Sequence, residues 1–326
     1  MTYLSGFARH SVTRRVCEAI ATLLGVTILT FVLLRIVPGN QITAQYGTAA
    51  GNLTHAQIQS LEAYYGLNKP PVVQYFDWLG GLFTGNFGFD VTSRQSVLSM
   101  TAQALPNTIE LAVLSIIVGL TLGVPGGLFA ASRPGRLRDH STQLVSLIAL
   151  SVPSFLLATA VSTWLADKLN WDPNGLGYVT LGANPGLNLE QMLLPALVLG
   201  ISIAPPVLQT TRASVLAIRA EDYVRTARAK GLRERRVLLR HVLRNSMVTF
   251  VSLFGLDFGA LVGGGAILTE VVFGIHGIGF LTYEALTNLD LPTIMATVVF
   301  GAFFIVLANA VVDVGYAWLD PRVRPT

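Results

Sequence analysis

Charged residues and cysteine are both scarce in this 326-residue sequence. Only 12% of the residues are charged and 52% are hydrophobic, whereas about 25% of the residues in soluble domains are charged. The single cysteine, Cys17, excludes an internal disulfide framework and a cysteine-based zinc cluster. None of the three lysines, Lys69, Lys168 and Lys230, is followed by serine or threonine, so the sequence has no Walker A loop for nucleotide phosphates. The composition indicates a protein whose solvent is largely a lipid bilayer.

Two further classes of site are missing. The five histidines include no His-Glu-x-x-His pair, so the ligand set of a zinc protease is absent, and His276 is interpreted as a structural or interfacial residue. The sequence pI of 9.4 comes from cations that lie beside apolar segments rather than in a soluble basic domain. This distribution argues against nucleic acid as a partner.

Six apolar blocks of about 20 residues are present, the length that a helix needs to cross a hydrocarbon core of about 30 Å. Hydropathy windows place these spans at residues 16–37, 108–131, 143–164, 192–208, 248–272 and 293–314. The sequence therefore predicts an all-α polytopic membrane protein with six transmembrane helices. The first block is longer than the apolar region of a signal peptide, and no small-x-small pattern follows it, so we expect it to be retained.

Positive charges are distributed unevenly between the two sides of this arrangement. If both termini are cytoplasmic, the inner segments hold the arginines at 9–15, 133–138 and 322–324 and ten cations from Arg212 to Arg244. The outer segments then hold Lys69, Arg94 and Lys168. Because cytoplasmic loops carry an excess of lysine and arginine, we predict that both termini are cytoplasmic.

Four acidic residues fall within the predicted spans, where charge is costly unless it faces protein or water. Glu110, Glu270 and Asp313 lie near span ends, and we favour interhelical hydrogen bonding for them over a polar lining of a translocation route. Asp257 lies deeper and fits both interpretations equally. Glycines at intervals of four in the same span predict close helix packing, within the subunit or against a partner. These glycines are Gly255, Gly259 and Gly263, followed by Gly264 and Gly265.

The inner loop between the fourth and fifth spans carries the sharpest motif. Asp222 suits the N-cap of a helix of about two turns, and Gly231 suits the left-handed residue just after it. Thr226, Ala227 and Gly231 give one face almost no side-chain bulk, so another protein could approach closely. A second amphipathic helix is expected from about Arg233. The arginines alone would equally fit a surface helix attracted to anionic lipid, so the residues leave both interpretations open.

At this loop the chain resembles ABC importer permeases, whose EAA loop has a related pattern. Ala227, Gly231 and Leu243 match the general pattern, whereas the positions that depart from it are Arg225, Thr226, His241 and Arg244. Residues 222–232 are similar to the version in the dipeptide and oligopeptide branch. Stretches at residues 35–40, 65–70, 78–82, 85–88, 105–108, 273–279 and 320–324 resemble the same branch in order and spacing. The long external segment after the first span favours a B-type subunit.

This resemblance implies a type I ABC importer permease fold and a subunit that translocates di- to oligopeptides across the cytoplasmic membrane. It implies a heterodimer with a second, homologous permease, two cytoplasmic ATPase subunits that bind ATP and magnesium, and an extracytoplasmic solute-binding protein. The residues expected to contact an ATPase are Asp222, Tyr223, Arg225, Thr226, Ala227 and Gly231, and Asp257 is a candidate for lining the translocation path. Neither a catalytic residue nor a cofactor or metal ligand is expected in this chain.

The resemblance also divides the chain into three parts. Residues 1–104 are expected to form the N-terminal tail, the first transmembrane helix and a long external segment. Residues 105–315 are expected to form the ABC transmembrane type-1 permease core, with a cytoplasmic coupling loop at 209–247, and residues 316–326 a cytoplasmic tail.

Other functions remain as alternatives. A secondary transporter or channel should show internal repeats and interrupted helices with buried mid-membrane charges, but no convincing repeat is seen and Asp257 is the one deep charge. An intramembrane hydrolase needs a nucleophile and a base on facing helices, and no such pair can be specified. Within the branch, relatives carry peptides but also nickel, glutathione and some sugars, so the cargo stays open.

Overall fold

The structure is a computed structural model that describes residues 2–36, 54–64, 68–90, 93–172, 174–175, 177–231 and 244–319. Within these residues it consists of helices and connecting segments, with one isolated β-bridge between Phe89 and Ser96. The expected helix from about Arg233 lies outside the described residues, as do His241 and Leu243 of the loop pattern. The all-α class predicted from the apolar blocks is confirmed.

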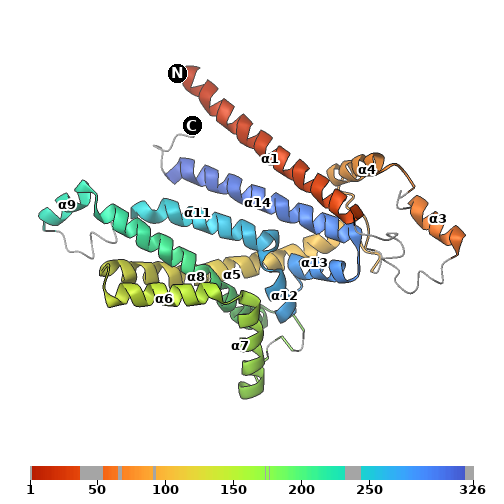
Figure 1. The fold of residues 1–326 in the computed structure, drawn as a ribbon. Coiled ribbons are helices and arrows are strands. Elements are labelled where there is room, and N and C mark those ends of the chain that lie inside the picture. The colour runs from red at the N-terminus through yellow and green to blue at the C-terminus, as the bar shows by residue number, and fades with distance from the viewer. Residues whose placement is uncertain are drawn as a thin grey trace.

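The helices follow one another as α1 (Thr2–Ile36), α3 (His55–Tyr64), α4 (Pro71–Phe83), α5 (Val97–Ser132), α6 (Leu137–Ser151), α7 (Ser154–Leu169), α8 (Pro185–Arg219), α9 (Asp222–Ala229), α11 (Arg244–Ala260), the π-helical turn η3 (Leu261–Gly265), α12 (Ile267–Phe273), α13 (Ile278–Thr287) and α14 (Leu291–Leu319). Figure 1 shows α1, α14, α11, α8 and α5 running lengthwise beside one another. These long helices form the body of the bundle.

Length and composition give four to six candidate membrane spans within the described residues. Four single helices qualify within Thr13–Ile36, Val97–Ser132, Pro185–Arg219 and Leu291–Gly315. Two bent pairs also qualify, α6 with α7 at 89° and Phe250–Gly265 with α12 at 61°. Counting each pair as one span gives the six that the hydropathy pattern predicts.

The bends are a difference from the continuous spans given by the hydropathy windows. Pro153 disfavours the helical conformation for the residue before it, and Val152 has extended dihedral angles of −93° and 117°. In the other pair, the backbone of Gly264 has a φ of +128°, which L side chains rarely adopt. Hydropathy records apolar length, and it does not detect a change of direction within that length.

α5 and α8 extend well past their predicted spans, as does α1, which begins 14 residues before the predicted start at residue 16. α5 begins 11 residues before the predicted start at residue 108, and α8 continues to Arg219 rather than ending at residue 208. Both extensions are more polar than the span centres, so the windows exclude them although the backbone stays helical. The extension of α8 carries the chain directly to α9.

Close packing of α5 against α8 forms the centre of the core. The fully buried side chains here include Leu111, Ile116, Met192, Val198 and Val207. A Cβ atom added at Gly123 would lie 2.7 Å from the Ala204 carbonyl oxygen and 2.7 Å from the Val207 side chain. The two backbones therefore approach to a distance that only glycine allows here.

The glycine repeat predicted to permit close packing lies against α14. A Cβ added at Gly259 would lie 2.8 Å from the Ala308 Cβ, and one added at Gly263 would lie 2.7 Å from the Ile305 side chain. The predicted close approach is confirmed, and it occurs within the subunit.

The N-terminal end of α1 and the C-terminal end of α14 lie at the same end of the bundle as α9. Figure 1 places the N-terminus of α1, the end of α14 and α9 at one end, and α3, α4 and α13 at the other. Arg15 on α1 forms an ion pair with Asp313 on α14 at 2.7 Å. The described ends of α1 and α14 thus lie at the same end of the bundle as α9, and the cytoplasmic orientation of the termini stays a prediction.

Candidate functional site

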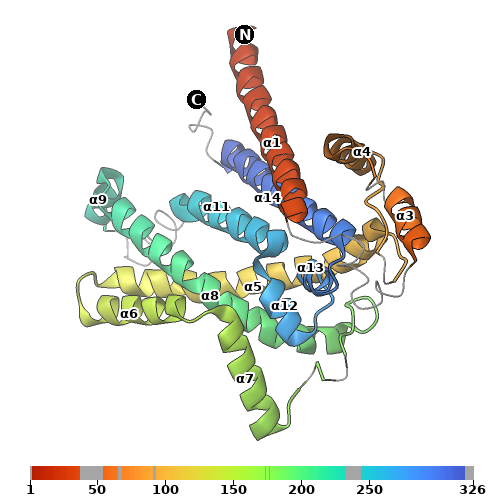
Figure 2. The same cartoon turned by 45° about the vertical axis from the view of Figure 1, so that its right-hand side comes forward.

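α9 is the short helix that the loop motif predicts, and it projects beyond the end of α8 (Figures 1 and 2). It begins at Asp222, so the cap position belongs to Glu221, one residue earlier than predicted. The Glu221 carbonyl accepts the backbone N–H groups of Val224 at 3.1 Å and Arg225 at 3.2 Å. The Asp222 carboxylate lies 3.5 Å from the Arg225 guanidinium, and its charge in the first turn complements the helix dipole.

The end of α9 has the left-handed glycine that the sequence predicts. The Thr226 carbonyl accepts the Lys230 N–H at 3.0 Å, and Gly231 follows with a φ of +76°. A Cβ added at Gly231 would meet nothing within 4 Å. The constraint at this position is therefore the backbone conformation rather than crowding.

Most of the residues predicted to contact an ATPase lie on the surface of α9. Arg225 and Thr226 are exposed and Tyr223 is 42% exposed, while the Ala227 side chain is outside the described residues. Val224 is fully buried. Thus α9 exposes most of these residues and buries Val224 on another side of the helix.

A short, hydrogen-bonded junction joins α9 to the bundle. The Glu221 N–H donates to the Ile218 carbonyl at 3.1 Å, and the Ala220 N–H donates to the Ala217 carbonyl at 3.1 Å. The Arg219 guanidinium donates to the carbonyl of Ala131, the penultimate residue of α5, at 2.5 Å. The junction between α8 and α9 is therefore two residues long, and the last residue of α8 is bonded to α5.

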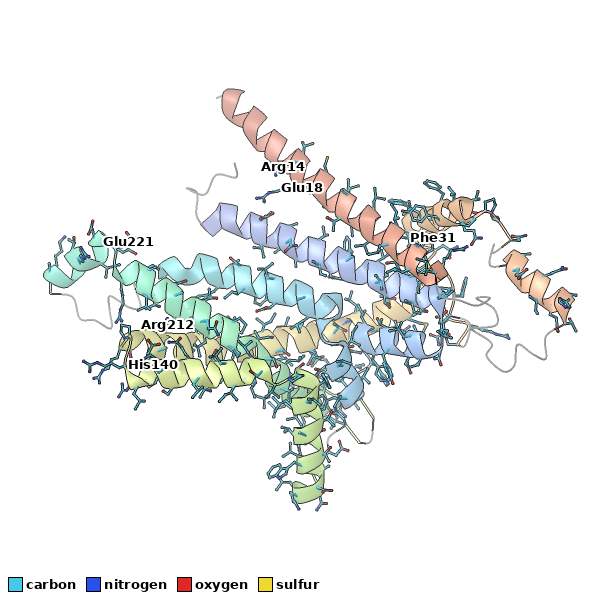
Figure 3. All side chains as sticks on the ribbon, viewed as in Figure 1. Arg14, Glu18, Phe31, His140, Arg212 and Glu221 are labelled. Carbon is cyan, nitrogen blue, oxygen red and sulfur yellow. The ribbon has the colours of Figure 1, made fainter. Side chains whose placement is uncertain are left out.

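A buried ion pair ties the same end of α8 to α6. The Arg212 guanidinium binds the Asp139 carboxylate through two contacts, of 2.6 and 2.7 Å. Asp139 is 1% exposed and also accepts from the Gly135 N–H at 2.8 Å and the Gln143 amide at 2.7 Å. Figure 3 shows Arg212 on the side of α8 that faces α6. Arg212, counted from sequence among the loop cations, is thus a structural partner within the bundle.

Asp257 lies on α11 and is partly exposed. It is on the face opposite the glycines that meet α14, since it is two residues from both Gly255 and Gly259. The neighbouring rings of Phe254 and Phe258 are stacked with centroids 6.1 Å apart. Among the described residues, no group forms a hydrogen bond or ion pair with the Asp257 carboxylate.

The other three acidic residues have partners on other helices, as the favoured interpretation predicts. Glu270 on α12 is fully buried and accepts from the Thr108 hydroxyl at 2.7 Å and the Phe280 N–H at 2.9 Å. Glu110 on α5 lies 3.5 Å from the Asn188 amide on α8. Asp313 forms the ion pair with α1 described above.

Sequence reasoning missed a polar network around Glu110 at the end of the bundle opposite α9. Asn107 donates to the His276 carbonyl at 2.8 Å, and Tyr178 donates to Asn107 at 3.3 Å. Asn188 donates to the Tyr178 hydroxyl at 3.1 Å. Burial, followed by the nearby charge of Glu110, raises the pKa of Tyr178 to about 12. The phenol therefore stays protonated at neutral pH and serves as a hydrogen-bond donor.

The partners in this network are up to 169 residues apart in the chain, so no local pattern reveals them. The only sequence signal was that Asn107 and Thr108 lie in one of the stretches that resemble the permease branch. The His276 ring packs edge-on against Tyr178 and Phe280, with centroids 6.2 and 5.1 Å away, which agrees with a structural role. Across the described part of the chain, no group of three or more metal-binding side chains is found.

Two family models match the chain. The model described as "Binding-protein-dependent transport system inner membrane component" matches residues 123–325, and its N-terminal counterpart matches residues 9–112. The chain is 34% identical over 316 residues to the oligopeptide transport system permease protein AppB of Bacillus subtilis. It is 33% identical over 332 residues to the di/tripeptide transport system permease protein DppB of Pseudomonas aeruginosa. Each alignment covers 96% of this chain and 98% of the relative.

The fold is similar to solved structures of the MetNI methionine ABC transporter in inward facing conformations. One crystal form gives a TM-score of 0.52 at 16% identity and covers 68% of this chain and 97% of the other. A second gives 0.54 at 17% identity and covers 68% and 96%. At this level of identity the likeness establishes the fold.

Proposed function

The chain belongs to the family of binding-protein-dependent transport system inner membrane components, and we propose that it is the B-type permease subunit of an ABC importer that carries di- to oligopeptides. The observation that carries the cargo assignment is the alignment of 96% of the chain with permeases named for oligopeptide and di/tripeptide transport. The family is a transporter component rather than a catalytic enzyme. The protein resides in the cell membrane, with the α9 end and both termini assigned to the cytoplasm from the positive charges.

We propose that α9 is the coupling helix that seats in a groove of one ATPase subunit. Its exposed Tyr223, Arg225 and Thr226 provide the contact surface, and the ends at Asp222 and Gly231 define its length. The junction through Arg219 supports this role because it can pass a push on α9 to both α8 and α5. The permease core at 105–315, with its loop at 209–247, is the part that this helix would move.

The proposed assembly contains a second, homologous permease, two ATPase subunits and an extracytoplasmic solute-binding protein. ATP and magnesium would bind to the ATPase subunits. When these subunits close on two ATP molecules, they would push the coupling helices and tilt the spans from inward-open to outward-open. Hydrolysis would then reset the cycle.

We propose that Asp257 lines the translocation path. Its mid-span position, partial exposure and lack of a partner within the described residues support a surface that meets water or cargo. An Asp257→Leu variant is expected to retain assembly and ATP turnover and to reduce peptide uptake. Uptake equal to that of the wild type would remove Asp257 from the path.

Substitutions at Gly231 test the coupling role, because some side chains tolerate the left-handed backbone of this residue and others do not. Gly231→Asn keeps a residue type that tolerates the left-handed conformation, whereas Gly231→Trp adds both strain and bulk. We expect Gly231→Trp to lose co-purification with the ATPase and peptide uptake, and Gly231→Asn to keep most of both. Full assembly and transport in the Gly231→Trp variant would refute the coupling role.

Uptake of peptides by a strain that lacks this subunit tests the cargo. We expect the uptake of labelled di- to pentapeptides to fall and to return when the wild-type chain is supplied. If peptide uptake is unchanged while uptake of nickel, glutathione or a sugar is lost, the cargo assignment is wrong although the permease assignment stands.

A further inference from the structure

The segment between α1 and α5 contains a helix that is fixed to the side of α1. Figures 1 and 2 show α4 near the C-terminal end of α1. The Phe31 ring of α1 lies 5.4 Å from Tyr75 and 6.4 Å from Trp78, measured between ring centroids. The Tyr75 hydroxyl is 2.9 Å from the Thr27 hydroxyl. One face of α4 is therefore attached to the last turns of a membrane span.

These contacts fix the depth of α4. Thr27 lies nine residues before Ile36, where the apolar span Thr13–Ile36 ends. At a rise of 1.5 Å per residue, Thr27 is about 13 Å below that end, in a hydrocarbon core about 30 Å thick. A helix whose tyrosine reaches this level lies at the membrane surface, not above it in water.

A second face of α4, beside the one attached to α1, is apolar and uncovered. Val72 is 66% exposed, Phe76 62% and Phe83 85%. Together with the partly exposed Leu79 they follow the spacing i, i+4, i+7 and i+11, which is one face of a helix. The stripe carries no charge, so a partner that binds through charged groups has nothing to recognise on it.

The flank of α4 is polar. Lys69, just before the helix, forms an exposed ion pair with Asp77 at 2.6 Å. A helix with one apolar face, one attached face and charges between them is the pattern of a helix that lies in the plane of a membrane surface.

We propose that α4 lies in the membrane surface at the C-terminal end of α1, with Val72, Phe76 and Phe83 inserted among the lipid chains. Lipid is the occupant that this depth favours, because the exposed Leu33 and Ile36 belong to the same end of the span Thr13–Ile36 as the residues that hold α4. The apolar face of such a helix is buried about 5–10 Å into the boundary between headgroups and chains. The segment predicted to be wholly external is then anchored to the membrane at its middle.

Fluorescent probes on single cysteines test the depth in the assembled complex in nanodiscs. With Cys17→Ser as background, Phe83→Cys and Phe76→Cys would carry the environment-sensitive label NBD. Leu33→Cys on α1 is the lipid-facing control, and Gln59→Cys on the exposed surface of α3 is the water-facing control. Quenching would be measured with nitroxides on lipid chains and with a water-soluble nickel chelate.

We expect the lipid nitroxides to quench the Phe83 probe to within a factor of about two of the Leu33 probe, and a shallow nitroxide to quench more than a deep one. We expect the nickel chelate to quench it less than the Gln59 probe. Nickel quenching equal to that of Gln59 would overturn the proposal. Protection from both quenchers would also overturn it, because a protein partner would then cover the stripe. Phe83 is so exposed that its replacement should not disturb folding.

Discussion

At the end of the bundle where α9 lies, one buried ion pair joins α6 to α8, whereas at the opposite end a network of mostly uncharged groups joins α5, α8, α12 and α13. The first contact is concentrated in Arg212 and Asp139, with Arg219 beside it. The second is spread over several donors, including Asn107, Thr108 and Asn188.

This difference fits the coupling role proposed for α9. A push that reaches α8 would carry α6 with it through the two charge-assisted bonds of Arg212 better than through neutral bonds, which are about half as strong. At the other end, many neutral bonds can exchange partners singly as the spans tilt. The contrast predicts that single substitutions lower the stability of the complex more at the α9 end than at the opposite end.

The largest effect is expected for Arg212→Leu. The substitution leaves the Asp139 carboxylate buried without its counter-charge, and removing one partner of such a pair typically costs 3–5 kcal/mol. Arg212 keeps 26% of its side chain exposed, so we expect about 3 kcal/mol, measured as a lower thermal unfolding midpoint of the purified complex.

The double variant Arg212→Leu with Asp139→Leu should regain part of this loss, because neither charge is then left alone. Arg14→Leu is the matched control, since its pair with Glu18 is on the surface and such pairs contribute little. If Arg212→Leu melts like Arg14→Leu, the contrast between the two ends is wrong.

A smaller effect is expected at the other end, for Glu270→Ala. Loss of the carboxylate leaves the Thr108 hydroxyl and the Phe280 N–H without their acceptor. Each unsatisfied buried group costs about 1–3 kcal/mol, but removal of a buried acid relieves its own desolvation, so we expect about 2 kcal/mol. The readout is again the thermal midpoint of the complex.

Glu270→Gln separates the charge from the acceptor positions. The amide keeps an oxygen for the Phe280 N–H, so it should lose less than half as much stability as the alanine variant. If the glutamine and alanine variants are equally unstable, the charge of Glu270 matters more than its bonds, and this end is not a neutral network.

The span number and the coupling motif could be predicted because they depend on local properties. Twenty apolar residues need a bilayer wherever they lie, and Gly231 suits a left-handed turn because of its own lack of a Cβ atom. The bends at Pro153 and Gly264 were also locally encoded, but hydropathy averages over them.

The rest of the site depends on contacts between distant residues. Arg212 and Asp139 are 73 positions apart, and either side chain alone is read as an ordinary surface charge. The same holds for Asn107 and the His276 carbonyl, which only the fold brings together. The glycines of α11 were noticed because they cluster, whereas those of α5 are separated by ordinary apolar residues.

A third effect concerns the α5–α8 contact that connects the two ends. In Gly123→Ala the new methyl group would lie 2.7 Å from the Ala204 carbonyl oxygen, so the helices must separate slightly. Overpacking of this kind lowers the free energy of unfolding by about 1–3 kcal/mol, and we expect a loss in the lower half of that range. The readout is the thermal unfolding midpoint of the complex. Gly25→Ala on α1 is the control, because its Cβ meets nothing within 4 Å, and it should be slightly stabilising through its better helix propensity. Equal stability of the two variants would show that the contact yields freely.

The smallest effect is a pH dependence at the end opposite α9, where Asp290 precedes α14 and faces Asp90. Burial, together with the hydrogen bond and charge of Asp90, raises the pKa of Asp290 to about 7, from 3.8 in the unfolded chain. The folded state therefore holds the proton more tightly, and this contribution to stability is complete below about pH 4 and is lost as the pH rises through 7. Because the segment around Asp290 can relax toward water once the carboxylate is charged, we expect the free energy of unfolding to fall by on the order of 1 kcal/mol between pH 5 and 8.

Asp290→Asn should flatten this part of the profile of thermal midpoint against pH, whereas Asp77→Asn, on the exposed flank of α4, should leave the profile unchanged. Asp290 would be excluded as the titrating group if the thermal midpoint of the wild type rises between pH 5 and 8, or if Asp290→Asn leaves the slope unchanged.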